Sequence, residues 1–133
     1  MAGFSLARKT GASRSEYQGY LASPAWKKRR RVYFETVRLS GFEPACQCCF
    51  TTLTEAKALD LHHLSYEGVT KDASGRWLSA EDEADLVPLC RDCHERLHTR
   101  LDARRMDYWG WDRRRATAVV LTYLRRELER ESK

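Results

Sequence analysis

The five cysteines are the residues whose spacing indicates the most about chemistry. Two C-x-x-C pairs, Cys46 with Cys49 and Cys90 with Cys93, stand far apart in the chain. In a chain without export features, such pairs are typical of a metal site rather than of disulfides. Four thiolates form a closed tetrahedral shell, the structural kind of zinc site. The sequence therefore predicts one structural zinc ion and leaves Cys48 as either a competing ligand or a buried thiol.

All four histidines lie close to the cysteine pairs or on the segment between them: His62, His63, His94 and His98. A helix from Cys90 to His98 would place His94 and His98 on one face, where they can hold one metal ion together. Residues 59–64 alternate apolar and polar side chains, which predicts a short strand. On that strand His62 and His63 point to opposite sides, so one can bind a metal while the other faces a substrate.

The flanking segments predict the elements that position these side chains. Ser23 followed by Pro24 is typical of the N-cap and first position of a helix, and Gly41 ends that helix. Residues 86–89 predict a second short strand, and residues 113–130 an amphipathic helix. Gly, Ser and acidic residues between Glu67 and Asp85 predict a long loop.

Length and composition restrict the class of protein. With 133 residues, 42% hydrophobic and 32% charged, the chain is one globular domain rather than a multi-domain or two-lobed enzyme. It is too apolar for wholesale disorder. It has no apolar run of the roughly 18 residues that a membrane span needs and no signal peptide, so we expect no membrane partner and a cytoplasmic location.

The net charge is +5, and it is unevenly distributed. Basic residues outnumber acidic ones in residues 1–45 and 99–133, whereas acidic residues dominate residues 46–98. A negative centre between two basic arms suits a metal site held between phosphate-binding faces. The same distribution also arises when Lys and Arg simply solvate helix surfaces.

The order of these motifs resembles that of the HNH endonuclease family, in the form that carries a structural zinc ribbon. The resemblance rests on Asp60-Leu-His62-His63, on the run from Asp85 through Cys90-Arg-Asp-Cys93-His94 to His98, and on the lead-in segment from Tyr20 to Trp26. It implies an α+β fold: a small ββα-metal core with a zinc ribbon, flanked by N-terminal and C-terminal helices. The implied division is an N-terminal tail (1–19), a nuclease domain with its lead-in helix (20–98) and a C-terminal helical extension (99–133).

The resemblance also implies roles for individual residues. His63 matches the general base that activates water, and His62, His94 and His98 match ligands of one catalytic divalent cation. Asp85 stands where most members have Asn, at the position that orients the base. An all-imidazole site prefers Mn²⁺, Ni²⁺ or Zn²⁺, although an acidic loop can supply oxygen ligands for Mg²⁺.

The expected function is therefore a divalent-metal-dependent endonuclease or nickase that hydrolyses phosphodiester bonds in DNA. The alternative is a non-catalytic zinc-ribbon module that keeps the fold and binds nucleic acid. A zinc-dependent deaminase is disfavoured, because neither His62 nor His63 begins the H-x-E pattern that such enzymes use.

The predicted contacts to DNA are cations of the helix after Ser23 and one residue beside the second cysteine pair: Lys27, Lys28, Arg30, Arg31 and Arg91. Contacts to phosphate position a protein on DNA without reading its sequence. We therefore expect low sequence specificity, or specificity supplied by a protein partner.

Overall fold

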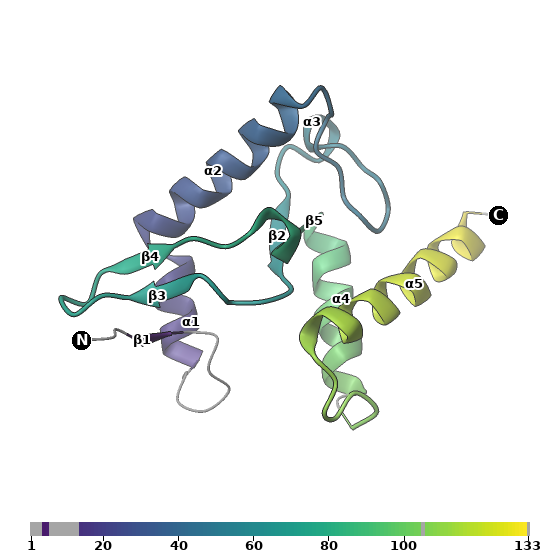
Figure 1. The fold of residues 1–133 in the computed structure, drawn as a ribbon. Coiled ribbons are helices and arrows are strands. Elements are labelled where there is room, and N and C mark those ends of the chain that lie inside the picture. Colours follow the sequence, from purple (N-terminus) through teal and green to yellow (C-terminus); the bar gives the residue numbers. More distant parts are fainter. Residues whose placement is uncertain (1–3, 6–13, 105, 133) are drawn as a thin grey trace. The chain divides into compact units, whose positions relative to one another are not determined.

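The computed structural model describes residues 4–5, 14–104 and 106–132 and has the expected mixed α+β class (Figure 1). The helices are α1 (Arg14–Leu21), α2 (Pro24–Leu39), α3 (Leu53–Ala56), α4 (Arg91–Ala103) and α5 (Arg113–Glu131), with a 3-10 helix η1 (Glu83–Asp85). The strands are β1 (Phe4–Ser5), β2 (Asp60–His63), β3 (Val69–Lys71), β4 (Trp77–Ser79) and β5 (Leu86–Leu89). Within the described residues, no helix is both long and apolar enough to cross a bilayer.

The chain forms two compact units that interleave along the sequence. The first unit comprises Met1–Phe42 and Ser65–Leu86, and the second comprises Glu43–Leu64 and Val87–Lys133. The sequence suggested consecutive segments with boundaries at residues 19/20 and 98/99, and that division stays a prediction. The units interleave because β2 pairs with β5, and the chain builds β3 and β4 between those two strands.

Helix α2 of the first unit starts where the sequence predicts. The Ser23 side chain accepts a hydrogen bond from the Trp26 amide at 3.2 Å, Pro24 follows at the first helical position, and Gly41 has a φ of +90°. Trp26 and Tyr33 are buried on one face of the helix. Helix α1 begins at Arg14, within the segment that the sequence assigned to a tail.

A β-hairpin occupies part of the predicted long loop, so that prediction is wrong over β3 and β4. The two strands are antiparallel, with Val69 opposite Ser79 and Lys71 opposite Trp77, and β1 pairs with the outer side of β3. Each strand has only three residues. A period of two cannot be recognised in only three residues. The Gly, Ser and acidic residues of the segment therefore predicted a loop.

We expect Gly68→Ala to destabilise the first unit more than Gly75→Ala. Both glycines have a positive φ, +85° and +86°, where an L-residue costs about 1–2 kcal/mol. A Cβ at Gly68 would also meet the Ala80 carbonyl oxygen at 2.3 Å, whereas at Gly75 it would meet nothing within 4 Å. The backbone clash should add about 1–3 kcal/mol. Urea denaturation of both variants measures the difference, and equal losses would contradict the close approach.

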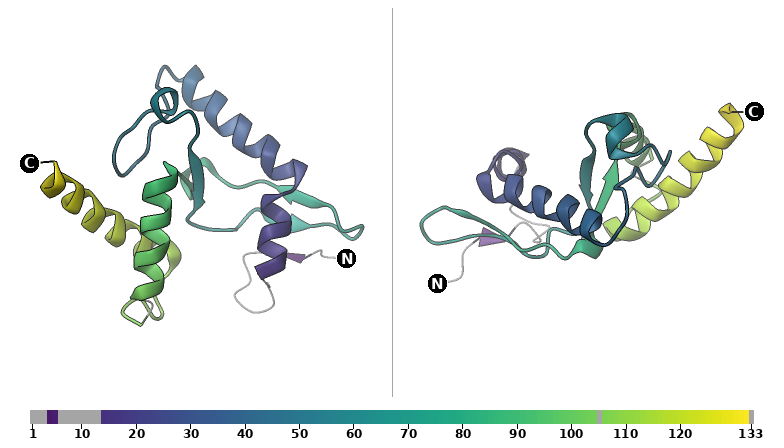
Figure 2. Two further views of the ribbon diagram at one scale, coloured as in Figure 1. Left: turned by 180° about the vertical axis from the view of Figure 1, so that it is seen from behind. Right: turned by 90° about the horizontal axis from the view of Figure 1, so that it is seen from above.

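The second unit confirms the remaining predicted elements. Strands β2 and β5 form a two-stranded sheet, and α4 follows β5 after one residue. Helices α4 and α5 are in contact and run at an angle to one another (Figure 2, left). Their facing side chains form the core of this unit: Leu97, Val120, Leu121 and Leu124 are all buried.

Candidate metal centres

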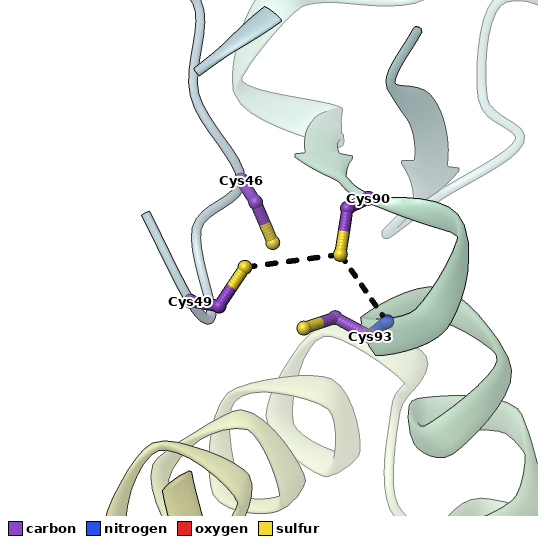
Figure 3. A group of neighbouring side chains, drawn as sticks. All are labelled: Cys46, Cys49, Cys90 and Cys93. Atoms are coloured by element: carbon purple, nitrogen blue, oxygen red, sulfur yellow. Dashed lines mark hydrogen bonds between the residues drawn. The ribbon is translucent and has the colours of Figure 1, made fainter. Parts of the chain in front are cut away.

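The four cysteines of the two C-x-x-C pairs converge on one point in the second unit (Figure 3). Their sulfur atoms all lie within 4.8 Å of one another, and the Cys49 and Cys90 sulfurs are 3.8 Å apart. A tetrahedral zinc ion with Zn–S bonds of about 2.3 Å holds its sulfurs about 3.8 Å apart. The four cysteines can therefore hold a structural zinc ion.

Local backbone geometry turns both cysteine pairs inward. In the first pair the Cys46 carbonyl accepts the Phe50 amide at 2.9 Å, with Phe50 in the left-handed region at φ +65°, and the Cys48 amide donates to the Cys46 sulfur at 3.4 Å. In the second pair Cys90 is the N-cap of α4, and its sulfur accepts the Cys93 amide at 3.4 Å. Amide donors of this kind stabilise thiolates.

Burial disfavours ionisation of two thiols of this cluster, Cys49 and Cys93. Burial raises the pKa of Cys93 and raises that of Cys49 to about 11. Burial also opposes ionisation of Cys46, but hydrogen bonds from neighbouring backbone amides lower its pKa overall. A dication at the centre reverses this balance because it stabilises the thiolates directly. Cys48 is 2% exposed and lies outside the four-cysteine set, so it is a buried thiol.

A second cluster in the same unit consists of His62 on β2 and His94 and His98 on α4. One ring nitrogen from each lies within 4.8 Å of the others, and the Nε2 atoms of His94 and His98 are 3.0 Å apart. Burial lowers the pKa of His98 and lowers that of His62 to about 2. Both imidazoles are therefore neutral near physiological pH, the form that binds metals.

The partners of the outer ring nitrogens show how this cluster fits a cation. His94 Nδ1 lies 3.0 Å from the Asp60 carboxylate, and His62 Nε2 lies 3.1 Å from the Thr117 hydroxyl. His62 Nδ1 is buried and has no hydrogen-bond partner among the described residues. A buried acceptor nitrogen without a partner is costly unless a ligand satisfies it. A metal ion held by the three histidines would do so, with Asp60 orienting His94 from behind.

Replacing Asp60 with asparagine should weaken metal binding at the three histidines by about 10- to 100-fold, because a carboxylate behind a ligating histidine raises its basicity and fixes its ring. Titration with Co²⁺ or Ni²⁺ of protein whose cysteine site already holds zinc measures this affinity. Asp82→Asn is the matched control, since Asp82 is exposed and its side chain makes no capping hydrogen bond. Equal affinities for the two variants would contradict the role of Asp60.

The other predicted catalytic residues are not members of this cluster. His63 is 2% exposed, follows His62 on β2, and its backbone carbonyl accepts a hydrogen bond from the Arg113 side chain. Asp85 ends η1 and is 7% exposed; it belongs to the first unit, whereas His63 belongs to the second. Orientation of His63 by Asp85 therefore stays a prediction.

The predicted DNA-contacting cations differ in their surroundings. Lys27 and Lys28 are exposed on the first two turns of α2. On the same helix Arg30 lies over the Phe34 ring, 5.9 Å from its centroid, and Arg31 is 4.0 Å from Glu35. Arg91 pairs with Asp60 at 3.2 Å in the second unit, so it also supports the histidine cluster.

Two residues of the candidate site received no role from the sequence, Asp60 and Thr117, and Arg113 was expected only to contact phosphate. Asp60 had a detectable signal, because it lies two residues before His62 and must therefore share its face of the strand. Arg113 and Thr117 belong to α5, far from β2 in sequence, and reach the histidines only through tertiary packing.

No protein-family model, curated protein or solved structure matches this chain. The candidate metal centres are therefore inferred from the geometry of their side chains alone.

Proposed function

We propose that the chain is a divalent-metal-dependent endonuclease or nickase of the HNH type that hydrolyses phosphodiester bonds in DNA. The observation that carries this proposal is the three-histidine cluster with its unpartnered buried nitrogen and its supporting carboxylate. Three imidazoles backed by an acidic residue form a metal site of a kind used for hydrolysis. The nearby four-cysteine site would supply the stability that so small a unit lacks.

The order of elements supports the same function. Strand β2 carries the histidine pair, β5 pairs with it, and α4 carries the two remaining histidines, all within the second unit. This is the strand–strand–helix order that the resemblance to HNH nucleases implies. The second cysteine pair begins α4, so zinc binding would fix the start of the helix that presents His94 and His98.

In the proposed mechanism the protein positions a water molecule beside the scissile phosphate. His63 accepts a proton from this water, a role suited to an imidazole because it exchanges protons near neutral pH. The water oxygen then bonds to phosphorus, and the bond to the 3′ oxygen breaks. When bound by the histidines, a cation would act as a Lewis acid on the phosphate and neutralise charge on the leaving oxygen.

The cationic side chains Lys27, Lys28, Arg30, Arg31 and Arg91 would bind the phosphate backbone of the substrate. These side chains are assigned to phosphates and not to base edges. We therefore infer that the protein has low sequence specificity, or that a protein partner supplies the specificity. A strong dependence of affinity on salt is expected from several phosphate contacts.

One observation favours the second candidate function, a non-catalytic nucleic-acid-binding module. His63 is only 2% exposed, whereas a general base must reach the attacking water. If the chain only binds nucleic acid, its histidine cluster would be a second structural metal site.

Incubation of the purified protein with supercoiled plasmid distinguishes the two functions. Separate reactions contain EDTA, Mg²⁺, Mn²⁺, Ni²⁺ or Zn²⁺. A nuclease converts the plasmid to nicked or linear DNA in at least one metal and not in EDTA. Absence of cleavage in every metal, together with a persistent gel shift, would reject the nuclease and favour the binding module.

A further inference from the structure

A groove in the first unit lies between the start of α2 and the turn that joins β3 to β4. Its volume is about 630 Å³. Residues 23–25 and Lys28 line it from α2, and residues 75–77 line it from the hairpin. Its charged lining residues are the cations Lys28 and Arg76, and none of the described residues that line it carries a carboxylate.

These two cations are available to a ligand, unlike Arg29. Arg29 of α2 donates hydrogen bonds from both Nε and Nη2 to the Glu81 carbonyl, at 3.2 and 2.9 Å. Its guanidinium therefore connects α2 to the segment after β4. Lys28 and Arg76 are both exposed, and within the described part of the chain neither has a carboxylate at ion-pair distance. The groove therefore has two cations that form no ion pair, although the charge of Arg76 also acts on the Asp72 carboxylate in the turn.

The hairpin turn holds the backbone of Arg76 in place. The Asp72 carboxylate accepts the amides of Ser74 and Arg76 at 3.0 and 2.9 Å, and the Asp72 carbonyl accepts the Gly75 amide at 3.0 Å. Gly75 has a φ of +86°, which completes the tight turn. A cation on a pre-organised turn loses less conformational entropy when a ligand binds.

The remaining lining of the groove is apolar and partly aromatic. Pro24 and Ala25 contribute on the helix side, and the half-buried Trp77 indole contributes on the hairpin side. The Lys71 ammonium lies 4.8 Å from the centre of the Trp77 ring, which adds a third cation near the groove. Cations beside a flat apolar surface suit a polymer that alternates phosphates with sugars and bases.

We propose that this groove binds the backbone of a nucleic acid strand, with Lys28 and Arg76 contacting phosphates and Trp77 contacting sugar or base. The inference takes the class of partner from the proposed function but does not require catalysis. It adds Arg76 and Trp77 to the contacts and singles out Lys28 among the α2 cations.

The test is fluorescence anisotropy of a labelled DNA duplex over a salt series, with the His63→Ala protein and no added divalent metal, so that DNA is not cut. In the Lys28→Gln/Arg76→Gln variant we expect affinity at low salt to fall at least about tenfold. The slope of log affinity against log salt should fall by about 1.8, since each phosphate contact contributes about 0.9. The matched control, Arg38→Gln/Arg130→Gln, removes two exposed charges from the last turns of α2 and α5.

The proposal is overturned if the groove variant and the control lose the same affinity and slope. If the double variant unfolds by circular dichroism, each single substitution is measured instead, with an expected slope change of about 0.9. Groove-dependent binding of labelled poly-glutamate as tight as that of DNA would overturn the nucleic acid as occupant. If DNA binding depends on the groove but the protein never cuts plasmid, the nuclease proposal is rejected and the groove proposal is supported. If the protein cuts plasmid but its DNA binding does not depend on the groove, the nuclease proposal is supported and the groove proposal is rejected.

Discussion

Cys90→Ala is expected to abolish zinc binding and to unfold the second unit. A structural zinc ion contributes about 10 kcal/mol or more of apparent folding free energy, as much as the whole stability of many domains. Cys90 also connects β5 to α4 as the N-cap of that helix, so its loss frees the start of the helix as well. Metal analysis of the purified protein and thermal unfolding followed by circular dichroism measure both effects.

Cys48→Ala is the matched control for this prediction. Cys48 lies between Cys46 and Cys49 in the chain and is buried, but it is not one of the four converging thiols. It should retain one equivalent of zinc and lose only the free energy of a small buried side chain, about 1 kcal/mol. A folded, zinc-loaded Cys90→Ala protein would show that the four-cysteine assignment is wrong.

Several helices and strands of the chain could be predicted because their signals are local. Ser23 and Pro24 mark the start of α2, and the alternation around His62 marks β2. Spacing alone also placed His94 and His98 on one helix face, and the cysteine pairs converge as expected. Local signals of this kind persist because tertiary contacts reinforce them.

Features set by contacts between distant segments could not be predicted in the same way. The strands β3 and β4 are stabilised by pairing with each other and with β1. Their three-residue sequences therefore do not by themselves indicate strands. Thr117 meets His62 only because α5 folds back onto the unit. Arg91 was predicted to contact DNA, but its pairing with Asp60 depends on β2 and α4 being neighbours.

His63→Ala is expected to abolish plasmid cleavage while leaving metal binding intact. Loss of a general base lowers the rate by about 10²- to 10⁴-fold. The imidazole of His63 is not one of the three clustered ligands, so affinity for Co²⁺ or Ni²⁺ should stay the same. Initial rates of nicking and a metal titration on the same preparation measure the two quantities.

His94→Ala serves as the comparison, because it removes a proposed metal ligand together with the contact to Asp60. This variant should lose both cleavage and metal affinity. Comparing it with the His63 variant therefore distinguishes a general base from a metal ligand. Since His63 is buried, circular dichroism must first show that His63→Ala is folded, and His63→Gln provides a larger replacement if it is not. Full cleavage by a folded His63 variant would remove this residue from the mechanism, and the base would then have to come from elsewhere in the protein.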